Sequence, residues 1–290
     1  MLRISDQFLD CSLYIYESSE KAENGTPSGG SGFLVAVPLP ANSEEVQLYV
    51  ATNRHVVEGF ENPVLRVNPV KDQSPFLKTN LHRWIIGKED DLAVLPLEIP
   101  QEDYRLACVP VRAFMTKDMA QVLGIGPGDE AFMVGRFISH EGKQKNTPTV
   151  RFGNLAMMAH EPMTNKYGQA QETFLVECRS IPGYSGSPVF VFIDPTLPRP
   201  PYWFTPAAPV YSPEYHGPWL LGVDWCHIQN YETVLDEDKE TPCVPKRWAK
   251  SNTGMAGVIP AWRLASLLEI DELVRQRKQR DDRITAEKNA

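Results

Sequence analysis

The chain has 290 residues, enough for one large hydrophobic core or two modest ones. Its hydrophobic fraction of 42% and charged fraction of 23% are those of an ordinary globular protein and exclude a largely disordered chain. The net charge of −8 argues against a nucleic-acid partner, because phosphate binding needs clustered Lys and Arg. We therefore expect a protein or peptide partner.

We expect neither a membrane span nor a secretory signal in this chain. Its first 20 residues lack a basic start followed by an unbroken apolar stretch, and no run of about 18 apolar residues occurs. The five cysteines are scattered without C-x-x-C spacing, which fits neither a disulfide framework nor a zinc site. We therefore expect a cytoplasmic protein that uses no membrane, metal or cofactor. The oligomeric state stays open.

Short runs rich in β-branched and aromatic residues, bounded by Gly, Pro, Asn and Asp, recur along the chain and indicate an all-β protein. In the first half they predict strands at 10–17, 31–38, 46–53, 63–69, 82–87 and 91–97. In the second half they predict strands at 105–111, 129–137, 148–158, 172–178, 187–193, 219–226 and 254–259. The two groups predict two β-barrels, one in residues 1–100 and one in residues 101–290.

Helical patterns are few. Residues 115–124 predict a short helix in the crossover between the barrels, and leucines at helical spacing after Pro260 predict a C-terminal helix at 261–279. The charged end after this helix is expected to be a frayed tail. Residues 193–218 contain eight prolines and predict a long loop.

Ser185 lies in the sequence GYSGSP (183–188), immediately before an apolar run. A nucleophilic serine needs a tight turn with backbone N–H groups beside it to receive an oxyanion, and glycine permits that turn. Gly183 and Ser185 would supply those two donors. Taken alone, the cluster is more typical of an ordinary β-turn before a strand.

Two further residues could complete a nucleophilic site. His55 lies at the end of a strand-like run, and Asp91 opens an apolar run. Alone, each is more typical of a structural or solvated residue. Their order, His, Asp and Ser, is the chain order of the catalytic triad on double-barrel proteases. Asp90 is the competing acid.

The chain resembles trypsin-like peptidases, especially bacterial members with a G-x-S-G-S-P motif such as the glutamyl endopeptidases. The motifs that carry the resemblance are GSGFLV (30–35), TNRHVV (52–57), DLAVL (91–95), GYSGSP (183–188), LLGVDW (220–225) and GVIP (257–260). The resemblance implies a chymotrypsin-like fold, with two six-stranded antiparallel β-barrels and a C-terminal helix. It also implies a serine endopeptidase in which His55, Asp91 and Ser185 form the triad. Asp91 is preferred to Asp90 because the family places the acid directly before the apolar run.

The resemblance also suggests substrate contacts. The strand that contains Asp224 and Trp225 looks like the one that holds extended substrate backbone. Arg179, six residues before Ser185, takes the position that lines the base of the primary pocket, where it would favour an acidic substrate residue. An arginine that points to solvent is the alternative. For the whole protein, the alternative function is a catalytically weak or inactive fold that binds peptides or acts as a scaffold.

Overall fold

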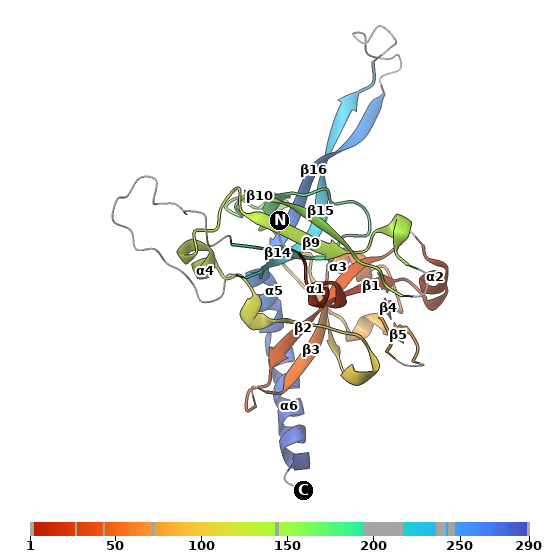
Figure 1. Ribbon diagram of the computed structural model, residues 1–290, viewed down its shortest axis with the longest axis vertical. Helices are drawn as coiled ribbons and strands as arrows, with labels where there is room; N and C mark the ends of the chain where they lie inside the picture. Colours follow the sequence, from red (N-terminus) through yellow and green to blue (C-terminus); the bar gives the residue numbers. More distant parts are fainter. Residues whose placement is uncertain are drawn as a thin grey trace.

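The computed structural model describes residues 3–26, 28–42, 44–70, 73–142, 145–193, 217–235, 242 and 247–288. Most of its regular structure is β-strand, arranged as an open sheet in the first half and a barrel in the second (Figure 1). Most of the predicted proline-rich loop, at 194–216, lies outside the described residues, as does Cys243.

The first half forms one sheet with the strand order β5-β4-β1-β2-β3-β7-β6, and β8 pairs with β2 in parallel. Its strands are β1 (Ser12–Tyr16), β2 (Gly30–Pro38), β3 (Val46–Thr52), β4 (Val64–Arg66), β5 (Phe76–Lys78), β6 (Ile85–Ile86), β7 (Ala93–Leu97) and β8 (Val109–Pro110). The centre of this sheet is the long β2–β3 pair.

The second half forms a closed barrel with the order β10-β13-β16-β15-β14-β9. Its strands are β9 (Glu130–Gly135), β10 (Thr149–Met157), β13 (Phe174–Glu177), β14 (Pro188–Val191), β15 (Trp219–Thr233) and β16 (Trp248–Pro260). A separate two-stranded hairpin, β11 (Met163–Thr164) and β12 (Ala170–Gln171), lies between β10 and β13 in the sequence.

The prediction of two closed six-stranded barrels therefore holds for the second half, whereas the first sheet is open at β5 and β6. The edge strands are short. The predicted strand 82–87 is instead a 3₁₀ turn, η1 (Leu81–Arg83), followed by the two-residue β6, and the predicted strand 105–111 contains only β8. Such short edges offer few backbone hydrogen bonds for closing a sheet. β8 lies after residue 100 yet belongs to the first sheet. The boundary between two domains near residue 100 stays a prediction.

One apolar cluster joins the two halves. It includes Phe33 and Tyr49 of the first sheet, Phe132 and Phe190 of the barrel, and Leu264 of the C-terminal region. Each half also has its own cluster of buried aliphatic side chains. Because the shared cluster buries side chains from both halves, sliding one half over the other would disrupt close packing.

The helices are short except at the C-terminus. They are α1 (Asp6–Asp10), α2 (Ser19–Asn24), α3 (Arg54–Val57), α4 (Lys117–Val122), α5 (Ala261–Leu268) and α6 (Asp271–Lys288), with 3₁₀ turns η2 (Gln101–Asp103), η3 (Val111–Ala113) and η4 (Ile138–His140). Short α4 lies within the predicted helix 115–124. No helix in the described ranges is long and apolar enough to cross a membrane.

The prediction for the C-terminus was wrong in two respects. The expected single helix 261–279 is two helices, and the expected frayed tail is the second half of α6. Polar contacts with the first sheet and its β2–β3 loop hold α6. Asp281 accepts a hydrogen bond from the Ala41 amide at 2.5 Å, Arg280 donates to Gln47 at 2.8 Å, and Lys288 pairs with Glu45 at 2.9 Å.

Arg277 anchors α6 most deeply. Its buried guanidinium donates to the Leu268 carbonyl at 2.6 Å and to the Tyr49 hydroxyl at 3.3 Å, and it pairs with Glu269 at 2.8 Å. The contact joins α6 to both the preceding helix and the first sheet.

We predict that Arg277→Met lowers the free energy of unfolding by about 1–3 kcal/mol, because it leaves the buried Leu268 carbonyl without this donor. Lys278→Met, at an exposed neighbouring position, should change it by less than about 0.5 kcal/mol. Urea unfolding followed by circular dichroism measures both. Equal effects would mean that α6 is not anchored through Arg277.

Candidate active site

The pairing of β3 with β7 brings His55 and Asp91 together. Thr52 at the end of β3 is the partner of Ala93 at the start of β7. His55 lies in α3, which begins two residues after the end of β3, and Asp91 lies two residues before the start of β7. The Nδ1 atom of His55 lies 2.6 Å from Oδ2 of Asp91, and the His55 amide donates to Oδ1 at 2.9 Å.

The two side chains differ in exposure. The Asp91 side chain is 1% exposed and that of His55 is 24% exposed, so the imidazole reaches solvent while its partner does not. Asn53 donates from its side chain to the Asp91 carbonyl at 3.0 Å, which fixes the backbone beside the acid. With Nδ1 donating to the carboxylate, Nε2 is the imidazole nitrogen that can accept a proton.

Asp90 has different partners. The Arg263 guanidinium of α5 donates to both Asp90 oxygens, from Nε at 3.0 and 2.9 Å. Gln171 of β12 donates to the same carboxylate at 2.8 Å. Of the two neighbouring acids, Asp91 is therefore the one in contact with the imidazole.

Gln171 also contacts the Asp91 backbone. Its side-chain oxygen accepts a hydrogen bond from the Asp91 amide at 2.9 Å. Gln171 and Arg263 come from the second half of the chain, so together they hold the acid-bearing loop of the first half from across the molecule. Sequence reasoning missed both residues, because neither lies in a motif that indicates a contact.

Two successive turns position Ser185. The Tyr184 amide donates to the Ile181 carbonyl at 3.1 Å, and the Ser187 amide donates to the Tyr184 carbonyl at 2.8 Å. The third residues of these turns are Gly183 and Gly186, with φ of 99° and 87°. Type II turns require a positive φ at this position, and glycine adopts it without strain. Ser185 occupies the second position of the second turn and is half-buried.

The amides predicted to receive an oxyanion are free. Among the described residues, neither the Gly183 nor the Ser185 N–H has a hydrogen-bond acceptor. The turn is fixed from behind by Ser31, whose hydroxyl donates to the Gly183 carbonyl at 2.8 Å and accepts from the Arg136 amide at 2.8 Å. Ser31 is fully buried. Sequence reasoning placed it in a strand motif and missed this contact.

The serine turn docks at the start of β2, beside α3. The Ser31 amide donates to the Ser185 carbonyl at 2.8 Å. A β-carbon at Gly30 would lie 2.7 Å from the Ser185 carbonyl oxygen and 2.9 Å from a methyl group of Val56, the residue after His55. Ser185 and the histidine helix therefore flank the same glycine. Within the described chain, no hydrogen bond joins the Ser185 hydroxyl to the His55 ring.

Asp224 of β15 supports the serine turn through its backbone. Its amide donates to the Ser187 carbonyl at 2.9 Å, and its carbonyl accepts from the Gly186 amide at 2.8 Å. The side chain is fully buried: Oδ2 accepts from the Ser180 hydroxyl at 2.8 Å, and Oδ1 has no partner. Burial raises the pKa of Asp224 to about 7. Trp225 is also buried.

The raised pKa makes the stability of the fold depend on pH. An unfolded aspartate ionises near pH 4, so from about pH 4 to 7 the folded chain holds one more proton than the unfolded chain at Asp224. The contribution of this group to the unfolding free energy therefore falls as pH rises through that range.

We predict that Asp224→Asn raises the melting temperature, relative to the wild type, more at pH 8 than at pH 4.5, because asparagine cannot ionise. Asp282→Asn, at an exposed position of α6, should produce no such difference. Thermal unfolding at the two pH values measures this. The same shift at both pH values would contradict an enclosed, ionisable Asp224.

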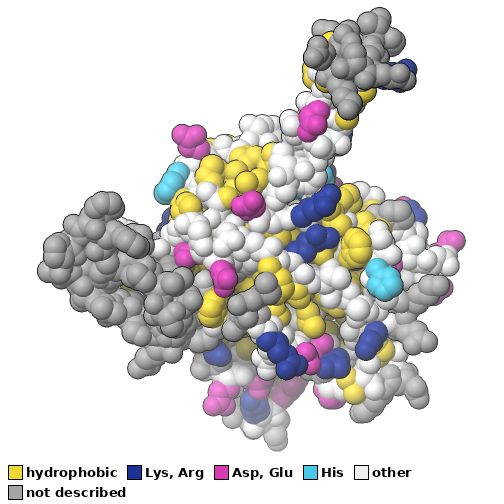
Figure 2. Space-filling view, turned by 45° about the horizontal axis from the view of Figure 1, so that its top comes forward, with side chains coloured by type: hydrophobic (Ala, Val, Ile, Leu, Met, Phe, Trp, Pro, Cys, Tyr) yellow, Lys and Arg dark blue, Asp and Glu magenta, His cyan; other side chains and the backbone are white. Residues whose placement is uncertain are grey.

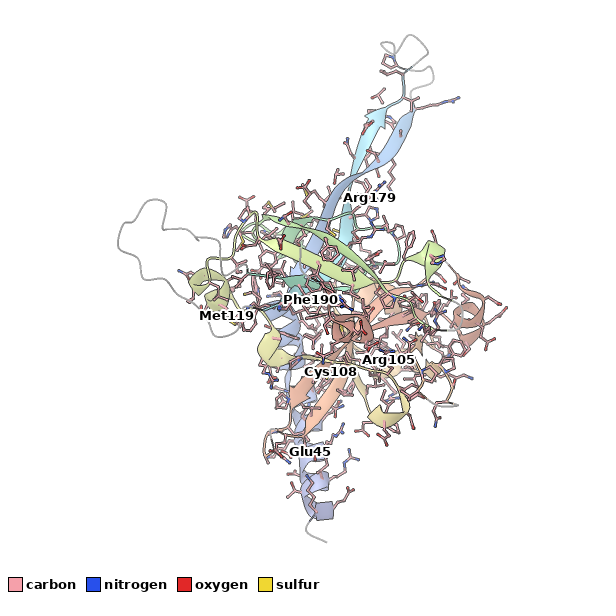
Figure 3. The ribbon with its side chains drawn as sticks, in the orientation of Figure 1. Glu45, Arg105, Cys108, Met119, Arg179 and Phe190 are labelled. Carbon is pink, nitrogen blue, oxygen red and sulfur yellow. The ribbon has the colours of Figure 1, made fainter. Side chains whose placement is uncertain are left out.

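Arg179 does not line an enclosed pocket. Its side chain is exposed, and it lies on the barrel near the base of the β15–β16 hairpin (Figure 3). An exposed guanidinium needs no substrate carboxylate to offset desolvation. His227, also in β15, is half-buried, and burial lowers its pKa.

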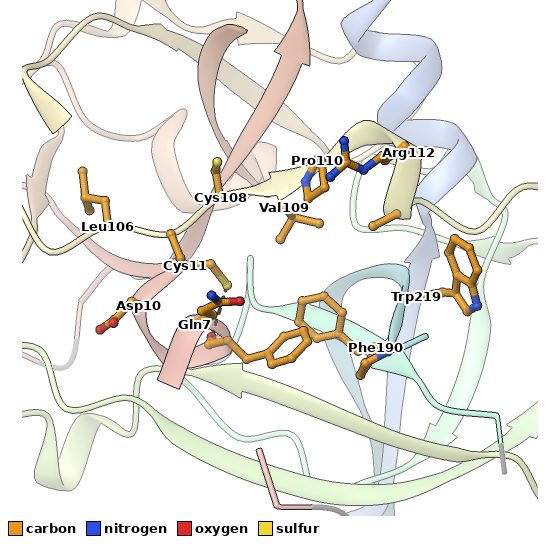
Figure 4. Close-up of a pocket in the computed structure, with 14 residues that line it drawn as sticks. Gln7, Asp10, Cys11, Leu106, Cys108, Val109, Pro110, Arg112, Phe190 and Trp219 are labelled. Atoms are coloured by element: carbon orange, nitrogen blue, oxygen red, sulfur yellow. Dashed lines mark hydrogen bonds between the residues drawn. The ribbon is translucent and has the colours of Figure 1, made fainter. Parts of the chain in front are cut away.

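A pocket is present elsewhere on the surface, away from the candidate site. A pocket of about 830 Å³ lies between α1, residues 106–113 and the start of β15, and none of His55, Asp91 and Ser185 lines it (Figure 4). The described residues include no group of three or more His, Cys, Asp or Glu side chains arranged to hold a metal ion. The groups that the candidate site brings together are the serine turn with its two free amides and the imidazole held by Asp91.

Comparison with known proteins identifies the family of the chain. No curated protein sequence matches the chain significantly. Among solved structures, the MamO protease domain from Magnetospirillum magneticum is similar, with 14% identity, a TM-score of 0.50, and coverage of 91% of this chain and 98% of that one. The HtrA-type protease AlgW with tripeptide has 15% identity, a TM-score of 0.47, and coverage of 90% and 60%. The family model of the trypsin-like peptidase domain matches residues 30–192, more than half of the chain. The chain therefore belongs to the trypsin-like peptidase family.

Proposed function

We propose that the chain is a serine endopeptidase that hydrolyses peptide bonds through an acyl-enzyme intermediate. The observation that carries the proposal is the 2.6 Å contact between His55 and a buried Asp91. His55 lies on α3, and α3 lies beside a serine turn with two free amides. These are the parts that acyl transfer requires: a base, a group that orients it, a nucleophile and oxyanion donors.

In this mechanism Ser185 Oγ attacks the carbonyl carbon of the scissile bond while His55 Nε2 takes its proton. Asp91 holds the imidazole in the required tautomer and stabilises the imidazolium. The Gly183 and Ser185 amides donate to the oxyanion of the tetrahedral intermediate. His55 then returns the proton to the leaving amine. Water attacks the acyl-enzyme by the same route and releases the second product.

The substrate class follows from the family: a peptide or protein, with its backbone held beside β15 at Asp224 and Trp225. Since the Asp224 side chain is enclosed and its amide and carbonyl are bonded to the serine turn, the backbone contact with substrate would begin at Trp225, the next residue of β15. We further propose a cytoplasmic location, supported by the free thiols of Cys11, Cys108, Cys178 and Cys226.

A second candidate function is peptide binding without turnover. The observation that favours it is the missing hydrogen bond between the Ser185 hydroxyl and the His55 ring in the described structure. A displacement of about 1 Å in a reacting group can cost about a hundredfold in rate. Catalytic hydrogen bonds can also tighten only when substrate binds, so the two candidates need a chemical test.

We predict that a fluorophosphonate probe labels the wild-type protein covalently and that Ser185→Ala is not labelled. Ser187→Ala, two residues along the same turn, is the matched control and should still be labelled if it folds. Mass spectrometry of the labelled peptide identifies the modified serine. Absence of labelling in the wild type would favour peptide binding without turnover, and equal labelling of Ser185→Ala would exclude Ser185 as the nucleophile.

The two neighbouring acids give a second test. Asp91→Asn should lower kcat by about 10⁴-fold, because the amide no longer supports the required imidazole tautomer. Asp90→Asn should cost far less, since its carboxylate contacts Arg263 and Gln171. Peptide hydrolysis and thermal unfolding of both variants measure this. A silent Asp91→Asn with a damaging Asp90→Asn would reverse the assignment.

A further inference from the structure

The strands β15 and β16 continue well beyond the barrel as a two-stranded ribbon, which we call the arm (Figure 1). It consists of residues 229–233 of β15 and residues 248–252 of β16, paired from Gln229↔Asn252 to Thr233↔Trp248. Sequence analysis predicted strands ending at 226 and beginning at 254, so it missed the arm. An isolated two-stranded ribbon gains little stability from its own contacts.

One face of the arm carries exposed aromatic side chains. Tyr231 pairs with Lys250, and Thr233 pairs with Trp248, so these four residues share one face. Tyr231 is 59% exposed and Trp248 is 61% exposed. The opposite face carries short polar contacts, such as Ser251 to Glu232 at 2.9 Å. Exposed tyrosine and tryptophan on one face indicate a surface that binds something.

The edge of the arm is also available. On the side away from β16, β15 pairs with β14 only as far as Val223, and no described strand covers that edge beyond Asp224. Alternate residues of such an edge present an unpaired N–H and C=O. An extended peptide can bind there as an added strand, with alternate side chains on the same face as the exposed aromatic residues. Figure 2 shows the arm standing away from the rest of the surface.

The same strand connects this edge to the candidate active site. Asp224 is bonded to the serine turn through both its amide and its carbonyl. From there β15 runs over residues 225–233 to the end of the arm, a path of roughly 30 Å at about 3.3 Å per residue. Two register shifts, at Asp224/Cys226 and at His227/Gln229, lie where the strand leaves the barrel. Bulges of this kind bend and twist a strand.

We propose that the arm binds the extended segment of a substrate polypeptide that precedes the scissile bond. A peptide added antiparallel to β15 would have its C-terminal end beside Asp224 and Ser185, where the acyl carbonyl must lie. Its preceding residues would run outward along 225–233, where alternate side chains would lie beside Tyr231 and the longer ones could extend over the same face toward Trp248 of β16. This class of substrate is an unfolded protein or long peptide, because the strands of a folded domain have their backbone groups paired with neighbouring strands. The proposal rests on the proposed function.

A binding experiment that needs no turnover tests the arm. The probe is fluorescein-labelled, reduced and carboxymethylated α-lactalbumin, an unfolded protein, added to the Ser185→Ala protein and followed by fluorescence anisotropy. Adding Tyr231→Ser and Trp248→Ser should weaken binding about fivefold or more, as expected for exposed aromatic contacts. The matched control is Asn230→Ser with Ala249→Ser on the opposite face of the same ribbon, which should bind like the parent.

Equal binding by the aromatic-face and opposite-face variants would overturn the proposal, provided that thermal unfolding shows both to be folded. A shortened arm, in which Asn-Gly joins Gln229 to Asn252 as a two-residue hairpin turn, gives the same test without relying on either substitution. Sedimentation of a dimer that the aromatic-face variant dissociates, with unfolded-protein binding unchanged, would instead assign the arm to a second copy of this chain.

Turnover provides an independent measurement. With a proteome-derived peptide library, the wild type should cut mainly where about eight or more residues precede the cut, and shortening the arm should remove this preference. An unchanged distribution would overturn the proposal. If the library is not cut at all, the proposed function fails while the binding experiment still decides the role of the arm.

Discussion

The candidate active site depends on the alignment of two separate β-structures. His55 and Asp91 belong to the first sheet and Ser185 to the barrel, so their relative position is set by contacts that cross between the halves. Ser31 donates two of these hydrogen bonds, to the carbonyls of Ser185 and Gly183. Gln171 accepts a third from the Asp91 amide. These groups are buried, and leaving one unpaired costs about 1–3 kcal/mol. The same hydrogen bonds therefore stabilise the fold and fix the site.

Behind Ser31 lies a buried cation. The Arg136 side chain is inaccessible to solvent, forms an ion pair with Glu141, and donates to the Ser28 carbonyl at 2.8 Å. It lies 4.2 Å from the centre of the Tyr16 ring. A charge without solvent is tolerated only when it is paired and fully hydrogen-bonded. Because its partners come from both halves, Arg136 restricts how the start of β2 can move against the barrel, and with it the serine turn.

The parts of the site encoded by short stretches of sequence could be predicted, and the parts created by tertiary contacts could not. The glycines around Ser185 indicate a tight turn wherever it lies in the fold. Gln171 and Arg263 carry no such local signal, since their partners are about 80 and 173 residues away in the chain. Likewise, the second half of α6 reads as a charged tail because, beyond buried Leu273, polar contacts with the first sheet rather than an apolar face hold it. The arm was missed because its strands are too polar to show a buried pattern.

Two buried carboxylates near Ser185 show why residue type alone does not determine a role. Asp91 has a donor for each oxygen, both from His55. Asp224 has one donor, Ser180, and an unpartnered second oxygen, and its burial favours the neutral acid up to about pH 7. Hydrogen bonds to a carboxylate favour its charged form, and burial without them opposes it. The negative charge that would stabilise an imidazolium is therefore provided by Asp91, while Asp224 contributes its backbone to the serine turn and to the strand that leads to the arm.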